Sequence, residues 1–304
     1  YNHKKALNIS DLELIAKKRL PNFVFEYLHG GSDDEHTLRH NREVFDQYLF
    51  KPKSLTKIGP RDLATSLLGK RYSLPMVIGP TGFNGMLTKH GDIKLASAAR
   101  SRDIPFVLSN VSTTALEDIT ALEGLSAWMQ IYFYRDRAFV RSLVERCRQA
   151  DVEAIVITTD SAIYGNREWD VRNFRRPMQP NLPNLLHMLS KPKWMLDVLY
   201  PDGPPTFKNL DALLPPNQRS AQGASVIIGQ QKSHDTSLEL ADENVGGLES
   251  SRVSVAIGTD GGEQVDDGAS TRRHGREEPD HDERIRRGDD RGIRSPRGRS
   301  PGRP

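Results

Sequence analysis

The chain has 304 residues, a net charge of +3 and a hydrophobic content of 36%. This length allows one large domain or two ordinary ones, and the mild charge gives no strong signal for nucleic-acid binding. The single cysteine excludes an intramolecular disulfide framework and a cysteine-based zinc cluster, and we expect no metal site.

The first 31 residues predict two helices. Residues 11–20 have an amphipathic pattern, with Ser10 as a suitable N-cap and Pro21 directly after the last turn. A second helix is expected over residues 22–29, and it ends at Gly30-Gly31.

A repeating pattern of short apolar runs follows. The runs are Pro75–Gly79, Ile104–Ser109, Ala127–Tyr132 and Glu153–Thr158. Their spacing of about 25 residues and their continuous apolar character predict successive βα units with a parallel sheet covered on both faces. A Rossmann sheet and a (β/α)8 barrel both fit this pattern. The turn from Gly79 to Gly85 lacks the Gly-x-Gly-x-x-Gly fingerprint, which disfavours the dinucleotide-binding version.

The segments between these runs have helical patterns. One helix ends near Arg102, a second is expected to open with a capping box at Thr114, and a third covers residues 136–150. Cys147 falls within the third pattern, so we interpret it as a packed helix residue.

Polar or small residues follow the strands where each one ends. They are Pro80, Thr81 and Gly82, then Ser109, then Gln130 and Tyr132, and finally Thr158 and Asp160. In a barrel of parallel strands, the carboxyl ends of the strands carry the active site. These positions are therefore the candidate site.

A long excursion rich in Pro, Leu and Trp spans residues 178–231. A segment of this length predicts a lid or a packing arm over the barrel. The alternative is peripheral membrane contact through residues 182–199, with apolar side chains in the interface and Lys191 and Lys193 at the headgroups.

The composition changes near Gln231, and no Phe, Trp or Tyr follows Phe207. Arginine supplies 11 of the 34 positions from residue 271 to residue 304. Such a segment cannot bury enough apolar surface to offset its ordering entropy. We therefore predict a domain over residues 1–231 and a disordered tail over residues 232–304. A reading-frame error is one explanation of the tail, and nucleic-acid binding through its arginines is the alternative, which the interleaved acidic residues weaken.

Several motifs resemble the FMN-dependent α-hydroxy-acid dehydrogenases and oxidases in order and spacing. They are Phe25–Glu35, Asn41-Arg42, Ile78–Gly82, Leu108-Ser109, Met129–Tyr132, Ile157–Asp160 and Gly165–Asp170. The resemblance covers residues 8–231, and the turn after Gly79 is most similar to the mandelate dehydrogenase branch.

The resemblance implies a (β/α)8 TIM barrel with FMN at the strand ends. The backbone of Pro80, Thr81 and Gly82 would face the flavin. The side chains of Ser109, Gln130 and Thr158 would hydrogen-bond the edge of the ring and tune the cofactor.

The resemblance also implies the substrate site. Tyr27 and Tyr132 would place hydroxyls on a 2-hydroxy acid, and Arg167 would face its carboxylate. Asp160 would stabilise the charged form of a catalytic histidine, which takes the substrate proton. Because Gly82 leaves space, an aryl substrate such as mandelate is expected, with lactate as the alternative.

The tail departs from the family pattern. The family continues with a strand that ends in a flavin-contacting lysine, a His-Gly-Gly-Arg segment and a phosphate-binding segment, and none is intact in this sequence. We expect no strand between Gln231 and Asp260. Asp260 stands where the base is expected and Glu263 where the arginine is, and residues 290–294 faintly resemble the phosphate segment. Weak FMN binding and little turnover follow, and a non-catalytic remnant is the alternative.

The remaining expectations concern partners and location. The electron acceptor is left open among oxygen, a quinone and a cytochrome, and a homo-oligomer is expected. No run of about 18 apolar residues and no apolar signal core occur, so the chain is expected in the cytoplasm or bound at the inner face of the cell membrane.

Overall fold

The structure is a computed structural model that describes residues 3–57, 59–132, 134–158, 165–176, 179–232, 254–259 and 262–264. The chain divides into two units, residues 1–268 and residues 269–304, and the second lies wholly outside the described residues. The predicted tail thus falls outside the described residues except for Lys232 and two short strands, and the predicted domain boundary at residue 231 stays a prediction.

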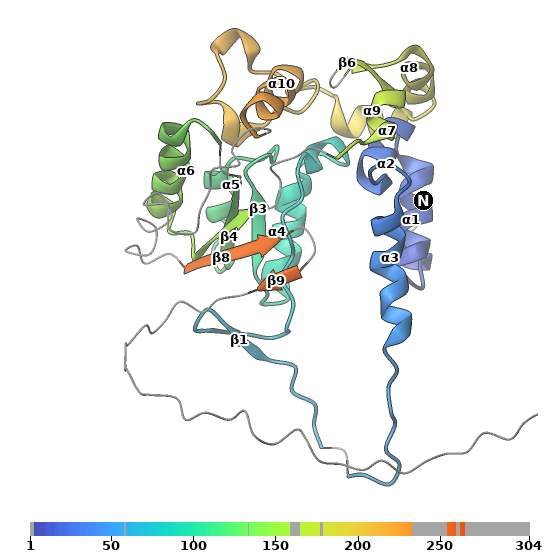
Figure 1. The fold of residues 1–304 in the computed structure, drawn as a ribbon, viewed down its shortest axis with the longest axis vertical. Helices are drawn as coiled ribbons and strands as arrows, with labels where there is room; N and C mark the ends of the chain where they lie inside the picture. Colours follow the sequence, from blue (N-terminus) through green and yellow to red (C-terminus); the bar gives the residue numbers. More distant parts are fainter. Residues whose placement is uncertain are drawn as a thin grey trace, which may run out of the picture. The chain divides into compact units, whose positions relative to one another are not determined.

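The centre of the fold is a five-stranded sheet (Figure 1). Its strands are β3 (Phe106–Ser109), β4 (Ala127–Tyr132), β5 (Ala154–Thr158), β8 (Ser254–Thr259) and β9 (Gly262–Gln264). They lie in the order β3-β4-β5-β8-β9, and all neighbours are parallel except β9, which is antiparallel to β8. Ile78 adds one parallel bridge to Phe106, so the predicted strand over residues 75–79 is reduced to that bridge.

The predicted parallel α/β sheet is confirmed by β3, β4 and β5. The expectation of no strand between Gln231 and Asp260 is wrong, because β8 lies there and pairs with β5. Val255 and Ile257 alternate with small residues in this strand, as strand propensity favours, but the polar surroundings obscured the signal.

The side chains of the strands alternate between two faces, because successive residues of a strand point to opposite sides. One face packs into the main core, and its strand residues are Phe106, Leu108, Met129, Ile131, Ile155 and Ile157. The other face forms a smaller cluster of Val107, Trp128, Ala154 and Val156 with Leu67, Leu68 and Val77. Ser109 and Gln130 share the alternation of this second face and lie at its carboxyl end.

Three helices connect the strands. They are α4 (Gly91–Ser101), α5 (Leu116–Thr120) and α6 (Arg137–Gln149). The side chain of Asp136 accepts a hydrogen bond from the N–H of Phe139, which caps α6, and Cys147 is buried in this helix as expected. The capping box predicted at Thr114 is wrong. Helix α5 begins after Ala115, the Thr114 N–H donates to Ser112, and Glu117 pairs with Arg146 instead of the helix start.

The amino-terminal part is helical. Its helices are α1 (Ile9–Arg19), α2 (Asn22–His29) and α3 (His36–Glu43). Asn8 caps α1 by accepting from the Asp11 N–H at 2.9 Å, so Ser10 lies inside the helix and is not its N-cap. Short 3-10 helices occur at His3–Lys5, Val44–Gln47, Asn84–Met86, Lys208–Leu210 and Pro216–Gln218.

An antiparallel hairpin of β1 (Thr65–Leu67) and β2 (Lys70–Tyr72) precedes the sheet. Tyr72 is buried, and its hydroxyl lies 2.8 Å from Oγ of Ser126 and 3.2 Å from a carboxyl oxygen of Glu153. Both partners lie just before a strand begins, so the hairpin is held at the amino ends of β4 and β5.

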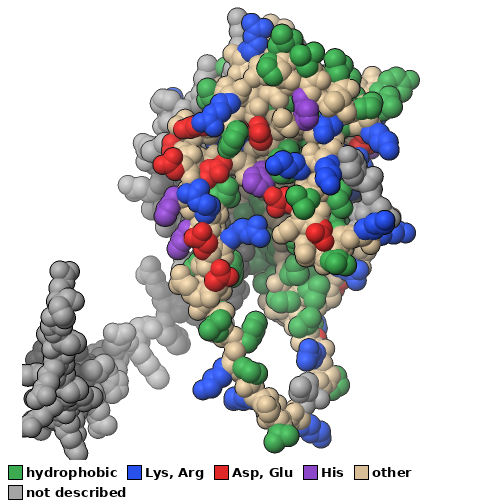
Figure 2. Space-filling model, turned by 90° about the vertical axis from the view of Figure 1, so that its right-hand side faces the viewer, with side chains coloured by type: hydrophobic (Ala, Val, Ile, Leu, Met, Phe, Trp, Pro, Cys, Tyr) green, Lys and Arg blue, Asp and Glu red, His purple; other side chains and the backbone are tan. Residues whose placement is uncertain are grey.

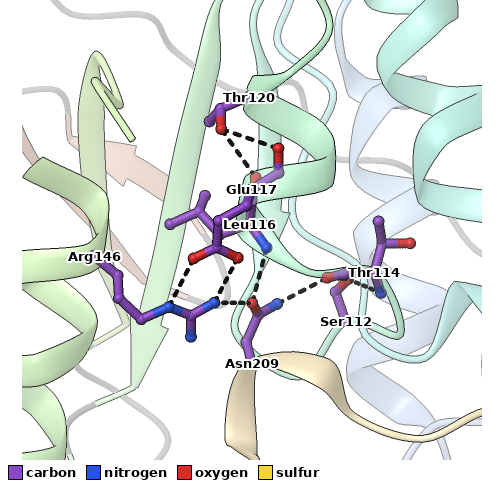
Figure 3. A network of polar contacts seen from close by, with 7 residues as sticks. All are labelled: Ser112, Thr114, Leu116, Glu117, Thr120, Arg146 and Asn209. Carbon is purple, nitrogen blue, oxygen red and sulfur yellow. Dashed lines mark hydrogen bonds and ion pairs between the residues drawn. The ribbon is translucent and has the colours of Figure 1, made fainter. Parts of the chain in front are cut away.

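The long excursion is mostly helical. It contains β7 (Gln179–Pro180), α8 (Leu182–Leu189), α9 (Pro192–Val198) and nearly all of α10 (Ala221–Lys232), and α7 (Glu168–Asn173) and β6 (Phe174–Arg176) precede it. Buried Asn209 donates to the carbonyl of Thr114 and accepts from the Leu116 N–H, and Arg146 joins Asn209 to Glu117 (Figure 3). These bonds pack the segment around Asn209 against the loop after β3 and against α5, and we call this part of the excursion the packing arm. Its predicted role over the barrel stays a prediction.

Candidate active site

Three polar side chains form a row across the carboxyl ends of β3, β4 and β5. The Ser109 hydroxyl donates to Oε1 of Gln130 at 3.0 Å, and Nε2 of Gln130 donates to Oγ1 of Thr158 at 2.9 Å. Ser109 and Gln130 are buried, so both ends of the Gln130 amide need partners, and the row supplies them. The structure thus brings together the three residues that the sequence predicted for the flavin edge.

The turn after Gly79 lies beside this row. The bridge at Ile78 aligns the turn with β3, and the Phe83 N–H donates to the carbonyl of Val111 at 3.0 Å. Pro80 and Thr81 are exposed. The turn thus lies at the carboxyl edge of the sheet, and the contact of its backbone with the flavin stays a prediction.

Gly82 is held in a close contact. A Cβ at this position would lie 2.8 Å from Cγ2 of Val111 and 3.7 Å from the Tyr27 hydroxyl. The first distance is shorter than side chains tolerate, so glycine is required by packing against Val111. The expectation that Gly82 leaves room for a bulky substrate gains no support from this contact.

Tyr27 and Arg167 form a contact pair next to the turn. The guanidinium carbon of Arg167 lies 5.5 Å from the centre of the Tyr27 ring, and Nη2 donates to the Tyr27 carbonyl at 2.5 Å. Tyr27 also packs edge-on against Phe83, with ring centres 6.4 Å apart. Burial raises the pKa of the Tyr27 hydroxyl, Arg167 opposes this and Asp170 adds to it, so the hydroxyl is kept protonated as a donor.

Asp170 is a residue that the sequence reasoning missed. Its Oδ2 accepts from Nε of Arg167 at 2.8 Å, while its buried Oδ1 has no hydrogen-bond partner among the described residues. The i, i+3 spacing of opposite charges at the start of α7 could have indicated the pair. Among the described residues, Nε and Nη2 of Arg167 are engaged, which leaves Nη1 for an anionic ligand.

The last two predicted site residues are Tyr132, which the structure describes, and Asp160, which it does not. Tyr132 ends β4 and stands opposite Thr158 in the register, so it lies at the same edge as the row. Asp160 lies outside the described residues, and its role beside a histidine stays a prediction.

Comparison with known proteins decides the family. Residues 16–245 match the family described as FMN-dependent dehydrogenase. The chain belongs to this family. The predicted resemblance is confirmed, and the match extends past residue 231, where we expected it to end.

Two relatives show how much of the family's length is present. The chain is 41% identical over 191 residues to (S)-mandelate dehydrogenase of Pseudomonas putida, covering 62% of this chain and 48% of that protein. It is 33% identical over 189 residues to L-lactate dehydrogenase of Serratia proteamaculans strain 568, covering 62% of this chain and 50% of that protein. The chain therefore spans about half the length of these relatives.

Solved structures confirm that the chain has the fold of part of an α/β barrel. A structure described as monotopic membrane protein (S)-mandelate dehydrogenase superposes with a TM-score of 0.74 and 34% identity, covering 84% of this chain and 66% of that one. Mandelate oxidase with (S)-4-hydroxymandelic acid gives a TM-score of 0.64 at 25% identity, covering 83% and 63%. The parallel sheet is thus part of a TIM barrel.

The residues of the site fit the ring of FMN. A flavin edge carries carbonyl and ring nitrogen groups, which need both donors and acceptors. The Ser109 hydroxyl already donates to Gln130 and accepts from the Val111 N–H. The row can therefore offer the Thr158 hydroxyl and the second hydrogen of the Gln130 amide, and the turn adds the exposed residues Pro80 and Thr81. The predicted phosphate-binding echo at residues 290–294 lies outside the described residues.

Proposed function

We propose that this chain is part of an enzyme that oxidises a 2-hydroxy acid to a 2-oxo acid with FMN. The hydrogen-bonded row of Ser109, Gln130 and Thr158 carries the proposal, because it places flavin-compatible groups on three adjacent strand ends. When bound, FMN supplies the redox chemistry by taking up two electrons. A mandelate-like substrate is proposed first, in keeping with the mandelate dehydrogenase relative, and a lactate-like one second.

The chain's own residues bind and orient the substrate in this proposal. Tyr27 and Tyr132 place hydroxyls on the substrate, and the guanidinium of Arg167 pairs with its carboxylate. Pro80, Thr81 and Gly82 present backbone to the ring. Asp160 is proposed to stabilise a charged histidine, but the histidine segment of the family is not intact in this sequence. We therefore expect weak FMN binding and little turnover from this chain.

Absorbance of the purified chain tests the proposal. After incubation with excess FMN and removal of the free cofactor, we expect a small retained flavin band that (S)-mandelate and L-lactate bleach little or not at all. Gln130→Leu should remove the retained flavin, because it breaks both bonds of the row, whereas Gln149→Leu at the exposed end of α6 should not.

Two results would contradict this picture. Rapid, complete bleaching would show that the missing histidine segment is not needed. Equal flavin retention by the Gln130 and Gln149 variants would show that the row does not hold the ring.

We further propose that α8 makes peripheral contact with a membrane. Its outward leucines follow helical spacing and are 64%, 41%, 60% and 62% exposed; they are Leu182, Leu185, Leu186 and Leu189. Figure 2 shows hydrophobic side chains near the top of this face, where α8 lies in Figure 1. The similar mandelate dehydrogenase structure is described as a monotopic membrane protein.

The inner sides of α8 and of the following helix α9 are packed against the rest of the protein. Nδ1 of His187 accepts from the Asn22 N–H at 3.1 Å, and the buried Trp194 donates to the carbonyl of Met86 at 2.8 Å. The leucines are therefore held outward by a fixed scaffold. Among the described residues, no helix is both long and apolar enough to cross a bilayer, and the proposed contact is made through the outward face of α8.

Co-sedimentation with vesicles of phosphatidylcholine and phosphatidylglycerol tests the membrane contact. The double variant Leu186→Glu, Leu189→Glu should bind at least about tenfold more weakly, because two leucines no longer enter the interface. The control Leu49→Glu, Leu55→Glu changes two leucines of another segment that are more exposed than those of α8, and it should bind like the unchanged chain. Similar losses in both variants would contradict contact through α8.

A further inference from the structure

A buried carboxyl group lies behind the turn that carries Pro80, Thr81 and Gly82. Asp92, in the first turn of α4, is 1% exposed. Its Oδ1 accepts from Nδ2 of Asn84 at 2.8 Å, and its Oδ2 accepts from the hydroxyls of Ser112 at 3.0 Å and Thr113 at 3.3 Å. Asp92 thus joins two segments that are 28 residues apart, the turn and the loop after β3.

The first of these segments is held through Asn84. This buried amide donates to the carbonyl of Thr81 at 3.2 Å and contacts its hydroxyl at 2.8 and 3.0 Å. Asn84 therefore connects Asp92 directly to the exposed part of the turn. Phe83 lies between Thr81 and Asn84 in the sequence and has a left-handed φ of 60°. This backbone conformation is strained for a residue with a large side chain, so surrounding contacts must hold it.

The second segment is held through the two hydroxyls. Thr113 Oγ1 bonds Asp92 and also accepts from the Gly85 N–H at 2.9 Å. Ser112 Oγ accepts from the Thr114 N–H, and its single hydrogen is shared between Asp92 and the carbonyl of Thr114, each 3.0 Å away. The loop that carries Val111, which packs on Gly82, is therefore fixed by the same carboxyl group.

We propose that Asp92 is a positioning residue for the flavin-facing turn. The inference rests on the proposed function, since it is the flavin that gives this turn its role. Asp92 touches neither the exposed edge of the turn nor the row of Ser109, Gln130 and Thr158, and it acts through Asn84, Ser112 and Thr113. Its carboxyl group offers only acceptors to three donors, which no amide at the same place can do.

Asp92→Asn tests this arrangement with nearly unchanged volume. One of the two side-chain positions becomes an NH2 donor. If it faces Asn84, two donors meet, and if Asn84 turns over, its oxygen faces the Thr81 carbonyl. If it faces Ser112 and Thr113, both hydroxyls must turn their hydrogens away and accept. The first two arrangements lose a bond that holds the turn, and the third loses the charge-assisted bonds from both hydroxyls.

Hydrogen exchange of the full chain gives a readout that needs no flavin. The amides of Phe83, Gly85, Met86, Leu87 and Thr88 donate to protein acceptors and should be protected. In Asp92→Asn their exchange should accelerate about tenfold or more, while peptides of β4 and α6 stay unchanged. The control Asn209→Ala removes a buried amide from the far side of the same loop, and it should lower the melting temperature without this local acceleration.

A compensating variant separates positioning from general damage. In Asp92→Asn, Asn84→Asp the new amide can donate to the new carboxyl group and accept from Ser112 and Thr113. The new carboxyl group can still accept from the Thr81 hydroxyl but no longer donates to the Thr81 carbonyl, so only part of the protection should return. Protection that is unchanged in Asp92→Asn, or not restored in the double variant, overturns the inference. Where Asp92→Asn yields no folded protein, the double variant alone decides in the same way.

The affinity of the variants for FMN is the second measurement. Titration of FMN fluorescence should show weaker binding to Asp92→Asn than to the unchanged chain, with partial recovery in the double variant. If the unchanged chain binds no FMN, the proposed function fails, but the exchange data still decide whether Asp92 holds the turn.

Discussion

The carboxyl group of Glu153 joins three side chains at the amino ends of β4 and β5. Nζ of Lys70 lies 2.5 Å from Oε1, and the hydroxyls of Ser126 and Tyr72 bond Oε2. Burial acts to raise the pKa of Glu153, but hydrogen bonds from Lys70 and Ser126 and the Lys70 charge outweigh it, so the pKa lies below its usual value.

A depressed pKa in the folded state stabilises the fold at pH values above the unfolded pKa, and this stability is lost as the pH falls through the folded pKa. Glu153→Gln should therefore lower the free energy of unfolding by about 1 kcal/mol at pH 7 and by much less below about pH 3. Urea denaturation at several pH values measures this. Glu145→Gln, in an exposed pair with Arg148, is the control and should change little. A Glu153 effect that grows as the pH falls would contradict the assignment.

Some site residues could be predicted from single positions and others could not. Ser109, Gln130 and Thr158 were found because polar residues at the ends of apolar runs are uncommon and follow the strand period. Asp92 and Asp170 were not found, because an acidic residue in the first turn of a helix is ordinary by itself. Their importance depends on partners that only the folded chain brings near.

The packing arm is attached to the sheet layer through Asn209 and Arg146, which differ in burial. Asn209 is fully buried and satisfies two backbone groups, Leu116 N–H and Thr114 C=O. Arg146 pairs with Glu117, whose side chain is 56% exposed, through two hydrogen bonds. Hydrogen bonds from Arg146 lower the pKa of Glu117, although burial opposes them.

Asn209→Ala should therefore destabilise the fold by about 2 kcal/mol, because the buried Leu116 N–H loses its partner and the Thr114 carbonyl keeps only the Ser112 hydroxyl. Arg146→Ala should cost about 1 kcal/mol or less, because water can replace the exposed part of the pair. Chemical denaturation of both variants measures the difference. A larger cost for Arg146→Ala than for Asn209→Ala would show that the ion pair, and not the amide, attaches the arm.

At the level of elements, three of the four continuous apolar runs form the predicted strands β3, β4 and β5, because consecutive apolar residues mark a strand that is buried on both faces. The fourth run, residues 75–79, is reduced to one bridge at Ile78. Helix starts were predicted less well. Asn8 and Ser10 are both good caps, and Thr114 and Ser112 are both good acceptors, so local chemistry alone did not select between them. Strand β8 was not predicted, because it pairs with β5, and a contact between distant segments leaves no periodic pattern in the sequence.

For the whole molecule, the family and the barrel type were predictable because several motifs recur in order at strand ends. The extent of the barrel was not, since the chain spans about half the length of the two relatives. Some apolar side chains lie far from any core in the described residues. Phe50 and Leu55 are fully exposed on the segment that follows η2 (Val44–Gln47).

The reversal from β8 to β9 has a consequence for ring closure. A ring of parallel strands grows only when the chain travels back to the amino side before each new strand, which requires a crossover on the outside. In this chain Thr259 pairs with Gly262 and Ile257 with Gln264, so the chain turns back on itself. Among the described residues, β9 runs in the opposite direction to the other strands of the sheet. A strand joined to β9 by a crossover would be parallel to β9 and would therefore run against β3, β4, β5 and β8, which does not continue the all-parallel pattern of a ring.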